Sequence, residues 1–240
     1  MPKTIAIFGF GPGLGMGTAR RFGREGFRVA VLGRNPDKAR RHAADLAAEG
    51  IEAAAFPTDV TDEKQVDAAI AHIESTLGPI DVAMHGAAAD IADRIPATLD
   101  VDPAALRIPL ALKLYSPILM TRALAPAMIE RGDGALLFSS GASDRHPMPY
   151  LSNFGVALAA QRGYLQQMAA ELRDTGVYVG LLNVGALIGN SKAEQIVDEH
   201  PEWVPAGLEL TRVGNDELGE LYWRMYTERR DLEVEVGFPS

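Results

Sequence analysis

The sequence predicts an α/β fold in which a doubly wound parallel sheet of about seven strands carries helices on both faces. Short apolar runs alternate with longer helical patterns along most of the chain, and such alternation gives a parallel sheet with right-handed crossovers. The runs are continuously apolar, as is typical of strands that are buried on both faces. The expected strands are Thr4–Phe8, Arg28–Leu32, Glu52–Phe56, Val82–His85, Ala135–Ser139, Val177–Asn183 and Leu232–Val236.

Helix start and stop signals lie between these runs. Asn35-Pro36 and Asp102-Pro103 each place a capping side chain before a proline that suits the first helical position. Two further segments place a cap and carboxylates at the positive end of a helix, namely Thr61-Asp62-Glu63 and Asn215-Asp216-Glu217. Glycines that suit helix ends follow at Gly50, Gly78 and Gly132.

Composition narrows the class of protein. A chain of 240 residues without an internal linker suits one domain, 1–240, with an irregular insertion at about 187–210. The net charge of −9 argues against nucleic-acid binding, and the absence of cysteine suits a reducing, cytoplasmic compartment. No uncharged run reaches the ~18 residues of a membrane span, and no ligand spacing indicates a metal site.

A glycine-rich segment follows the first expected strand and precedes a helix from about Met16. The spacing G-x-G-x-x-G fails in register, whereas G-x-x-x-G-x-G fits. Glycine lets backbone approach a pyrophosphate closely, and a helix N-terminus supplies free N–H groups. We therefore expect a Rossmann-type dinucleotide site whose loop residues are Gly9, Gly11, Gly13, Leu14 and Gly15.

The end of the second expected strand indicates which dinucleotide binds. An NAD site commonly has a carboxylate there to hold the ribose 2′-hydroxyl. This chain instead has Gly33 and Arg34. Lys38 could also contact the 2′-phosphate, or it could belong to a solvated helix face. Arginine attracts a 2′-phosphate, so NADP(H) is favoured over NAD(H). The alternative is that Arg34 is a solvated residue at a helix start.

These residues resemble the short-chain dehydrogenase/reductase family, and the resemblance continues to about residue 190. Phe8 to Gly15 looks like the family's T-G-x-x-x-G-x-G loop, and Asp59-Val60 looks like its adenine-binding pair. His85-Gly86-Ala87-Ala88 stands in place of N-N-A-G. The resemblance implies further cofactor contacts from Gly185 and Leu187, near the family's P-G turn.

The resemblance breaks at the catalytic residues. Gly134 to Ser140 resembles the fifth strand with its catalytic serine, Ser140. Counting back from Glu171 places the family's Tyr-x-x-x-Lys pair at Phe154 and Leu158, and counting back from Pro126 places its asparagine at Lys113. Of the usual set only the serine remains. Positioned acid–base catalysis contributes ~10²–10⁴ in rate, and phenylalanine cannot supply it.

Other groups could replace the lost acid. Lys113 could supply a cation from the opposite helix, or it could direct its amine to solvent. Tyr150, one turn before Phe154, could donate a proton or could pack in a loop. His85 or His146 could donate a proton near neutral pH. His85 could instead border the cofactor, or it could be a core histidine. Ser140 would donate a hydrogen bond to a substrate oxygen.

The sequence thus favours an NADP(H)-dependent oxidoreductase that acts on a small organic substrate such as an imine or an activated alkene. Ser140, Lys113 and Tyr150 are its candidate catalytic residues, and Trp203 is a candidate lid residue or core anchor. A non-catalytic NADP(H)-binding regulator, or a non-redox enzyme that keeps the dinucleotide as structure, remains as an alternative. The family resemblance implies a homodimer or homotetramer.

Overall fold

The structure is a computed structural model that describes residues 2–88, 97–148, 151–204 and 210–238, without the side chain of Trp203. Seven parallel strands form one sheet in the order β3-β2-β1-β4-β5-β6-β9. The order reverses between β1 and β4, so the sheet is doubly wound, as predicted. The strands are β1 Thr4–Phe8, β2 Arg28–Gly33, β3 Ala53–Pro57, β4 Ile80–His85, β5 Gly134–Gly141, β6 Val177–Val184 and β9 Glu233–Val236.

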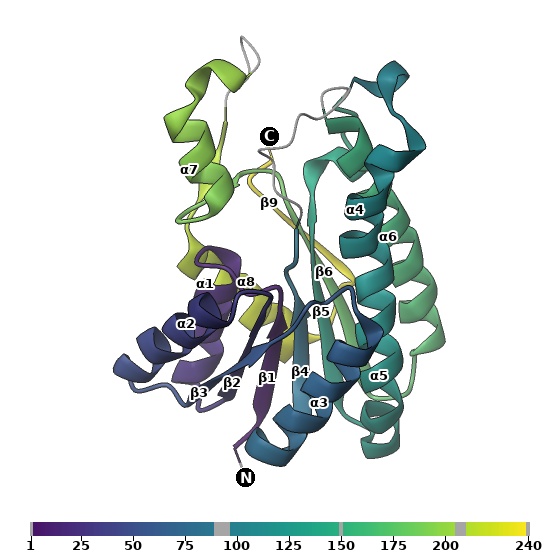
Figure 1. Ribbon diagram of the computed structural model, residues 1–240. Coiled ribbons are helices and arrows are strands. Elements are labelled where there is room, and N and C mark those ends of the chain that lie inside the picture. Colours follow the sequence, from purple (N-terminus) through teal and green to yellow (C-terminus); the bar gives the residue numbers. More distant parts are fainter. Residues whose placement is uncertain (1, 89–96, 149–150, 205–209, 239–240) are drawn as a thin grey trace.

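Helices cover both faces of the sheet (Figure 1), and each face has its own hydrophobic cluster. On one face lie α1 Leu14–Arg24, α2 Pro36–Ala48 and α8 Asn215–Glu228. On the other lie α3 Glu63–Leu77, α5 Ser116–Arg131 and α6 Ser152–Glu171. A short helix, α4 Arg107–Leu110, leads into α5 through a π-helical turn, Ala111–Tyr115.

The helix starts agree only in part with the prediction. Asn35 and Asp62 cap α2 and α3 through their side chains. Asp102 caps a 3-10 turn, Pro103–Leu106, and not an α-helix. The expectation for Asn215 is wrong, because Gly214 is the cap and Asn215 already lies inside α8. The Asn215 amide instead reaches back to the Pro12 carbonyl oxygen, at 3.4 Å.

The expectation of an irregular insertion at 187–210 is also wrong in part. The segment begins with strand β7 Leu187–Ile188, which pairs with β8 Arg212–Val213, and between them lies helix α7 Lys192–Glu199. The Ser191 side chain accepts the Glu194 N–H, and Glu194 accepts the Asn190 N–H. This arrangement resembles a capping box, whose S-x-x-E pattern is visible in the sequence, but Glu194 accepts from the residue before the cap instead of from the cap itself.

Helices α1 and α8 cross with their backbones in contact. A Cβ atom on Gly17 would lie 1.9 Å from the Asn215 carbonyl oxygen, and one on Gly219 would lie 2.4 Å from the Gly17 oxygen. A side chain at either position would therefore force the helices apart. The crossing fixes α8 against the helix that follows the glycine loop.

Candidate functional site

A cavity of about 600 Å³ opens at the carboxyl ends of β1, β2, β3 and β4. Its wall includes Gly9 after β1, Gly33 at the end of β2, Thr58 after β3 and Ala87 after β4. Ligands of open parallel sheets bind in the crevice beyond the carboxyl ends of the strands, where the strand order reverses. The cavity lies at that point, between β1 and β4.

Gly9 permits a backbone approach that no other residue allows. Its φ is +78°, and a Cβ atom there would lie 2.4 Å from the Ala87 Cα atom. The Gly86 N–H donates to the Phe8 carbonyl oxygen at 2.8 Å, which holds the ends of β1 and β4 together. A side chain at position 9 would clash with the Ala87 backbone and force the ends of β1 and β4 apart.

The remaining loop residues continue directly into α1. Leu14 is the first residue of the helix, two positions earlier than the sequence indicated. Cβ atoms on Gly13 and Gly15 would lie 3.1 Å from Ile188 and 3.2 Å from Phe10. A Cβ atom on Gly11 would meet nothing within 4 Å. Gly13 therefore brings the β7–α7 segment against the loop, so α7 lies beside the cavity.

The cavity wall is cationic in a chain whose net charge is −9. Four cationic side chains line it, and no carboxylate does so among the described residues; the four are Arg34, Lys38, Arg41 and Lys192. The Gln195 side chain of α7 also contributes. An anionic ligand is therefore attracted to this cavity, and a carboxylate that would repel a 2′-phosphate is absent from its described lining.

Of the predicted adenine-binding pair, Val60 lines the cavity and Asp59 holds the turn that contains it. Val60 is buried and lines the cavity. The Asp59 carboxylate accepts hydrogen bonds from the Thr61 backbone and hydroxyl, at 2.9 and 2.7 Å. Asp59 thus orders the turn that places Val60 against the cavity.

The other predicted cofactor contacts lie at the same edge of the sheet. The Gly185 N–H donates to the Val236 oxygen, which links the end of β6 to β9. Leu187 starts β7, and its N–H donates to the Thr211 oxygen. The Ile188 side chain next to it contacts the site of Gly13 in the glycine loop.

His85 is a core residue at the end of β4. Its side chain is fully buried, its ring stacks on Phe138 with centroids 6.4 Å apart, and its Nε2 atom lies 2.8 Å from Ser116 Oγ. Burial is the main reason that its pKa falls to about 3, and the nearby Lys113 charge lowers the pKa further. The ring is therefore neutral at physiological pH. This arrangement fits the core alternative that the sequence left open.

Lys113 directs its amine inward. The residue is 6% exposed and lies in the π-helical turn between α4 and α5. Its Nζ atom donates to the Ser139 carbonyl oxygen at 3.2 Å and to Ser139 Oγ at 3.4 Å. Burial lowers the pKa of Lys113 to about 8. A pKa near the operating pH suits a general acid.

Ser140, the next residue of β5, is 7% exposed, and its hydroxyl oxygen has no hydrogen-bond partner among the described residues. The facing residue of β6 is Asn183, whose Oδ1 atom is also unpartnered there. Leu158 of α6 approaches the neighbouring Gly141, to 3.4 Å from a Cβ atom placed on it. Phe154 lies one turn earlier in α6, whereas Tyr150 lies outside the described residues.

Two features of this region were missed from the sequence. The π-helical turn around Lys113 has no compositional signal apart from the nearby Pro109 and Pro117, which cannot donate backbone hydrogen bonds. The roles of Ser139 and Ser116 become visible only when β4, β5 and α5 are brought together. The S-x-x-E pattern from Ser191 to Glu194 was present in the sequence and would have indicated the start of α7.

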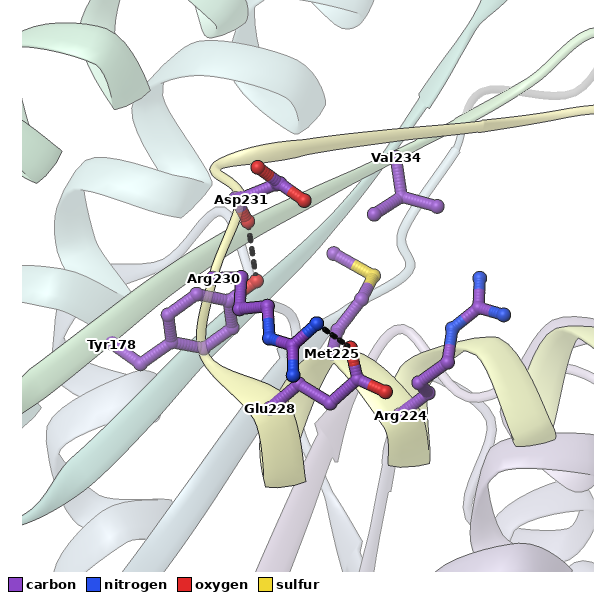
Figure 2. A pocket seen from close by; sticks show the side chains of 7 residues that line it. All are labelled: Tyr178, Arg224, Met225, Glu228, Arg230, Asp231 and Val234. Atoms are coloured by element: carbon purple, nitrogen blue, oxygen red, sulfur yellow. Dashed lines mark hydrogen bonds and ion pairs between the residues drawn. The ribbon is translucent and has the colours of Figure 1, made fainter.

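A second hollow, of about 220 Å³, lies at the opposite end of the sheet, between α8 and β9 (Figure 2). Two contacts join residues of its lining. The Tyr178 hydroxyl donates to the Asp231 carbonyl oxygen at 2.6 Å, and burial raises the pKa of Tyr178 to about 12. Arg230 pairs with Glu228 at 3.8 Å. This hollow is far from the strand ends that carry the glycine loop, so we assign the candidate site to the larger cavity.

Residues 3–199 match the family described as short chain dehydrogenase. The chain belongs to this family. Among curated short chain dehydrogenases, one from Pseudocercospora fijiensis is 29% identical over 188 residues, which cover 77% of this chain and 60% of that protein. Dehydrogenase/reductase SDR family member 4 of Sus scrofa is 27% identical over 208 residues, covering 85% of this chain and 73% of that protein.

Solved structures show the same fold. A gluconate 5-dehydrogenase from Burkholderia cenocepacia, crystallised with NADP and tartrate, superposes with a TM-score of 0.81. The alignment covers 98% of this chain and 93% of that one at 23% identity. Within the described parts of this short chain dehydrogenase, no helix is long and apolar enough to cross a bilayer. The described residues also hold no group of three or more possible metal ligands of the His, Cys, Asp or Glu type.

The buried Lys113 makes stability depend on pH. Its pKa is about 8 in the folded chain and 10.5 in the unfolded chain, so between these values the unfolded chain binds more protons. The Lys113 contribution to the free energy of unfolding therefore rises with pH through this window, and its burial cost is fully present below pH 8. From about pH 7 to 10.5, the wild type should gain about 3 kcal/mol relative to Lys113→Met in urea unfolding. A constant difference between the two proteins would contradict this assignment.

Proposed function

We propose that the chain is an NADP(H)-dependent oxidoreductase of small molecules with an atypical acid–base centre. The observation that carries this proposal is the cavity at the reversal of strand order, which has a glycine cradle and four cationic side chains without a carboxylate among its described lining residues. Relatives of this family are named as dehydrogenases and reductases, which supports the reaction class.

The residues present fit a phosphorylated dinucleotide. Gly9 allows the backbone to approach Ala87 at the base of the cavity, and α1 begins within the glycine segment, at Leu14, with its free N–H groups. Arg34 and Lys38 follow the end of β2, where they would contact the 2′-phosphate. A hydrogen bond between charged groups contributes about 1.5–3 kcal/mol, enough to favour NADP(H) over NAD(H). When bound, the nicotinamide supplies or accepts a hydride.

The chain's own residues would bind and protonate the substrate. Ser140 lies at the carboxyl end of β5, where the family's catalytic serine is expected, and Lys113 contacts the same strand end through Ser139. The Ser140 hydroxyl, free of described partners, would hold a substrate heteroatom. The Lys113 ammonium would deliver the proton that balances the hydride, to the nitrogen of an imine or to the enolate of an activated alkene. Tyr150 remains a candidate donor outside the described residues.

Hydride transfer can be tested without knowing the substrate. We expect deuterium from 4-deuterated NADPH, labelled on either face, to appear in a product when the enzyme meets a pool of small metabolites, as read by mass spectrometry. Lys113→Met should abolish this transfer while NADPH affinity stays within a few-fold, because the amine acts after binding. Absence of label, with NADPH binding confirmed, would move the proposal to a non-catalytic NADP(H)-binding regulator. Unchanged transfer in Lys113→Met would remove Lys113 from the chemistry.

The cofactor preference can be tested on the cavity wall. Arg34→Ala should weaken NADPH binding about 10- to 100-fold, since it removes a charge-assisted contact to the 2′-phosphate, and should leave NADH binding within a few-fold. Arg40→Ala is the matched control. Arg40 lies on α2, the helix that follows Arg34, but it pairs with Asp37 at 2.7 Å and does not line the cavity. Titration of both cofactors by calorimetry measures the effect, and equal losses for NADPH and NADH would refute the assignment.

We also propose a homo-oligomer, as the family resemblance implies. Four large apolar side chains of the α4–α6 region are exposed to solvent, with exposed fractions of 43–60%: Ile108, Tyr115, Ile129 and Val156. A second copy of the chain would bury them. Light scattering should give at least twice the 25.7 kDa of one chain, and Val156→Arg should reduce it to that mass. Leu99→Arg, at a fully exposed position outside these helices, is the control. A 25.7 kDa wild type would contradict the proposal.

A further inference from the structure

The Lys113 ammonium is held by one neighbouring residue. An ammonium has three N–H donors. Two of them are directed to Ser139, one to its carbonyl oxygen at 3.2 Å and one to its hydroxyl oxygen at 3.4 Å. The third donor has no partner among the residues that the structure describes. The ammonium is therefore anchored on one side and free on the other.

The Ser139 hydroxyl is oriented as an acceptor. It donates its own proton to the His85 carbonyl oxygen, at 3.4 Å. A hydroxyl has one proton and two lone pairs, so this bond leaves the lone pairs for the Lys113 amine. If the hydroxyl proton pointed toward Lys113, it would face the N–H donors of the ammonium and no hydrogen bond could form between them. The end of β4 thus determines which way Ser139 faces.

The helix that carries Lys113 is attached to the same strand by a second bond. Ser116 lies three residues after Lys113, hence on the same side of the helix, and its Oγ atom is 2.8 Å from His85 Nε2. The His85 ring is fully buried and stacks on Phe138. The π-helical turn of Ala111–Tyr115 is therefore attached to the sheet through His85 and Ser139, and π-turns of this kind are frequent at functional sites.

The described groups that pack around the Lys113 amine are uncharged. His85 is the titratable group of β4 that interacts electrostatically with Lys113, and it is neutral because burial depresses its pKa. From β5 the contacting residue is Ser139. The residues of α6 that are buried carry no charge; they are Asn153, Ala157, Leu158, Gln161, Leu165 and Met168. The two acceptors on Ser139 are therefore the described contacts that favour the charged amine.

We propose that Ser139 and His85 are positioning residues that keep the Lys113 amine protonated and direct its third N–H to the reacting atom. The inference rests on the proposed function of Lys113 as proton donor. His85 sets the direction of the Ser139 hydroxyl through its backbone and fixes the helix through its ring. Ser139 supplies the acceptors.

The pKa of Lys113 can be measured without turnover. The chain has five lysines, so selective ¹³C or ¹⁵N labelling of the lysine side chains gives a simple spectrum, in which Lys113→Met assigns the Lys113 signal. We expect Ser139→Ala to lower the pKa of Lys113 by about one unit, because an acceptor that favours the charged form is lost. At a pH above that pKa this corresponds to about tenfold less protonated amine. Ser139→Thr restores the hydroxyl and should restore the pKa.

The control is Ser75→Ala, which removes a hydroxyl that donates to a backbone carbonyl on the surface of α3. An unchanged Lys113 pKa in Ser139→Ala would overturn the proposal. So would a fall that Ser139→Thr does not reverse, since packing would then be the cause. Should Ser139→Ala not fold, Ser139→Cys gives the same test with a weaker acceptor of similar size.

Turnover separates this inference from the proposed function. The pH dependence of kcat for deuteride transfer should shift down with the Lys113 pKa in Ser139→Ala, while KM for NADPH stays unchanged. A shifted pKa combined with unchanged transfer in Lys113→Met would mean that the proposed function fails although the Ser139 contact is real. Transfer that needs Lys113 but has the same pH profile in Ser139→Ala would overturn the positioning role alone.

Discussion

The close approach of Gly9 to Ala87 is the constraint on which the candidate site depends. It holds the ends of β1 and β4 so near that only a residue without Cβ and with a positive φ is accommodated. These are the two strands between which the order of the sheet reverses, so the approach sets the floor of the cavity. From that floor, the chain that follows β1 passes through the glycine loop into α1, and the chain that follows β2 carries Arg34 to the wall.

Burial of the Lys113 charge governs the proposed acid–base part of the site. The family resemblance places the usual tyrosine and lysine at Phe154 and Leu158 of α6, whereas the buried Lys113 lies in the π-helical turn that leads into α5. A lysine so deeply buried retains its charge only if acceptors compensate for the lost water. The compensation comes from Ser139, and through it from the carboxyl end of β4. The chemistry proposed here thus relies on the sheet more than on α6.

The sequence predicts the sheet well because buried parallel strands are continuously apolar, and the seven expected strands appear within a few residues of their predicted ends. The glycine loop is equally readable, since its spacing reflects local backbone requirements. Prediction fails where tertiary contacts decide. Asn215 resembles a cap but serves as a donor to Pro12. For His85 the sequence left the core position as one alternative, and the contact between β4 and α5 decides it. The inward direction of Lys113 was one of two open alternatives, because a lone lysine among leucines is compatible with either.

The crossing of α1 and α8 joins a helix inside the family match to a helix outside it. The match ends at residue 199, yet α8 presses its backbone on Gly17, one turn inside the helix that begins at the glycine loop. Neither Gly17 nor Gly219 can acquire a side chain unless the other helix moves. Each position is therefore restricted to glycine as long as the two backbones keep this contact. The C-terminal region can diverge freely in sequence only as long as that crossing is preserved.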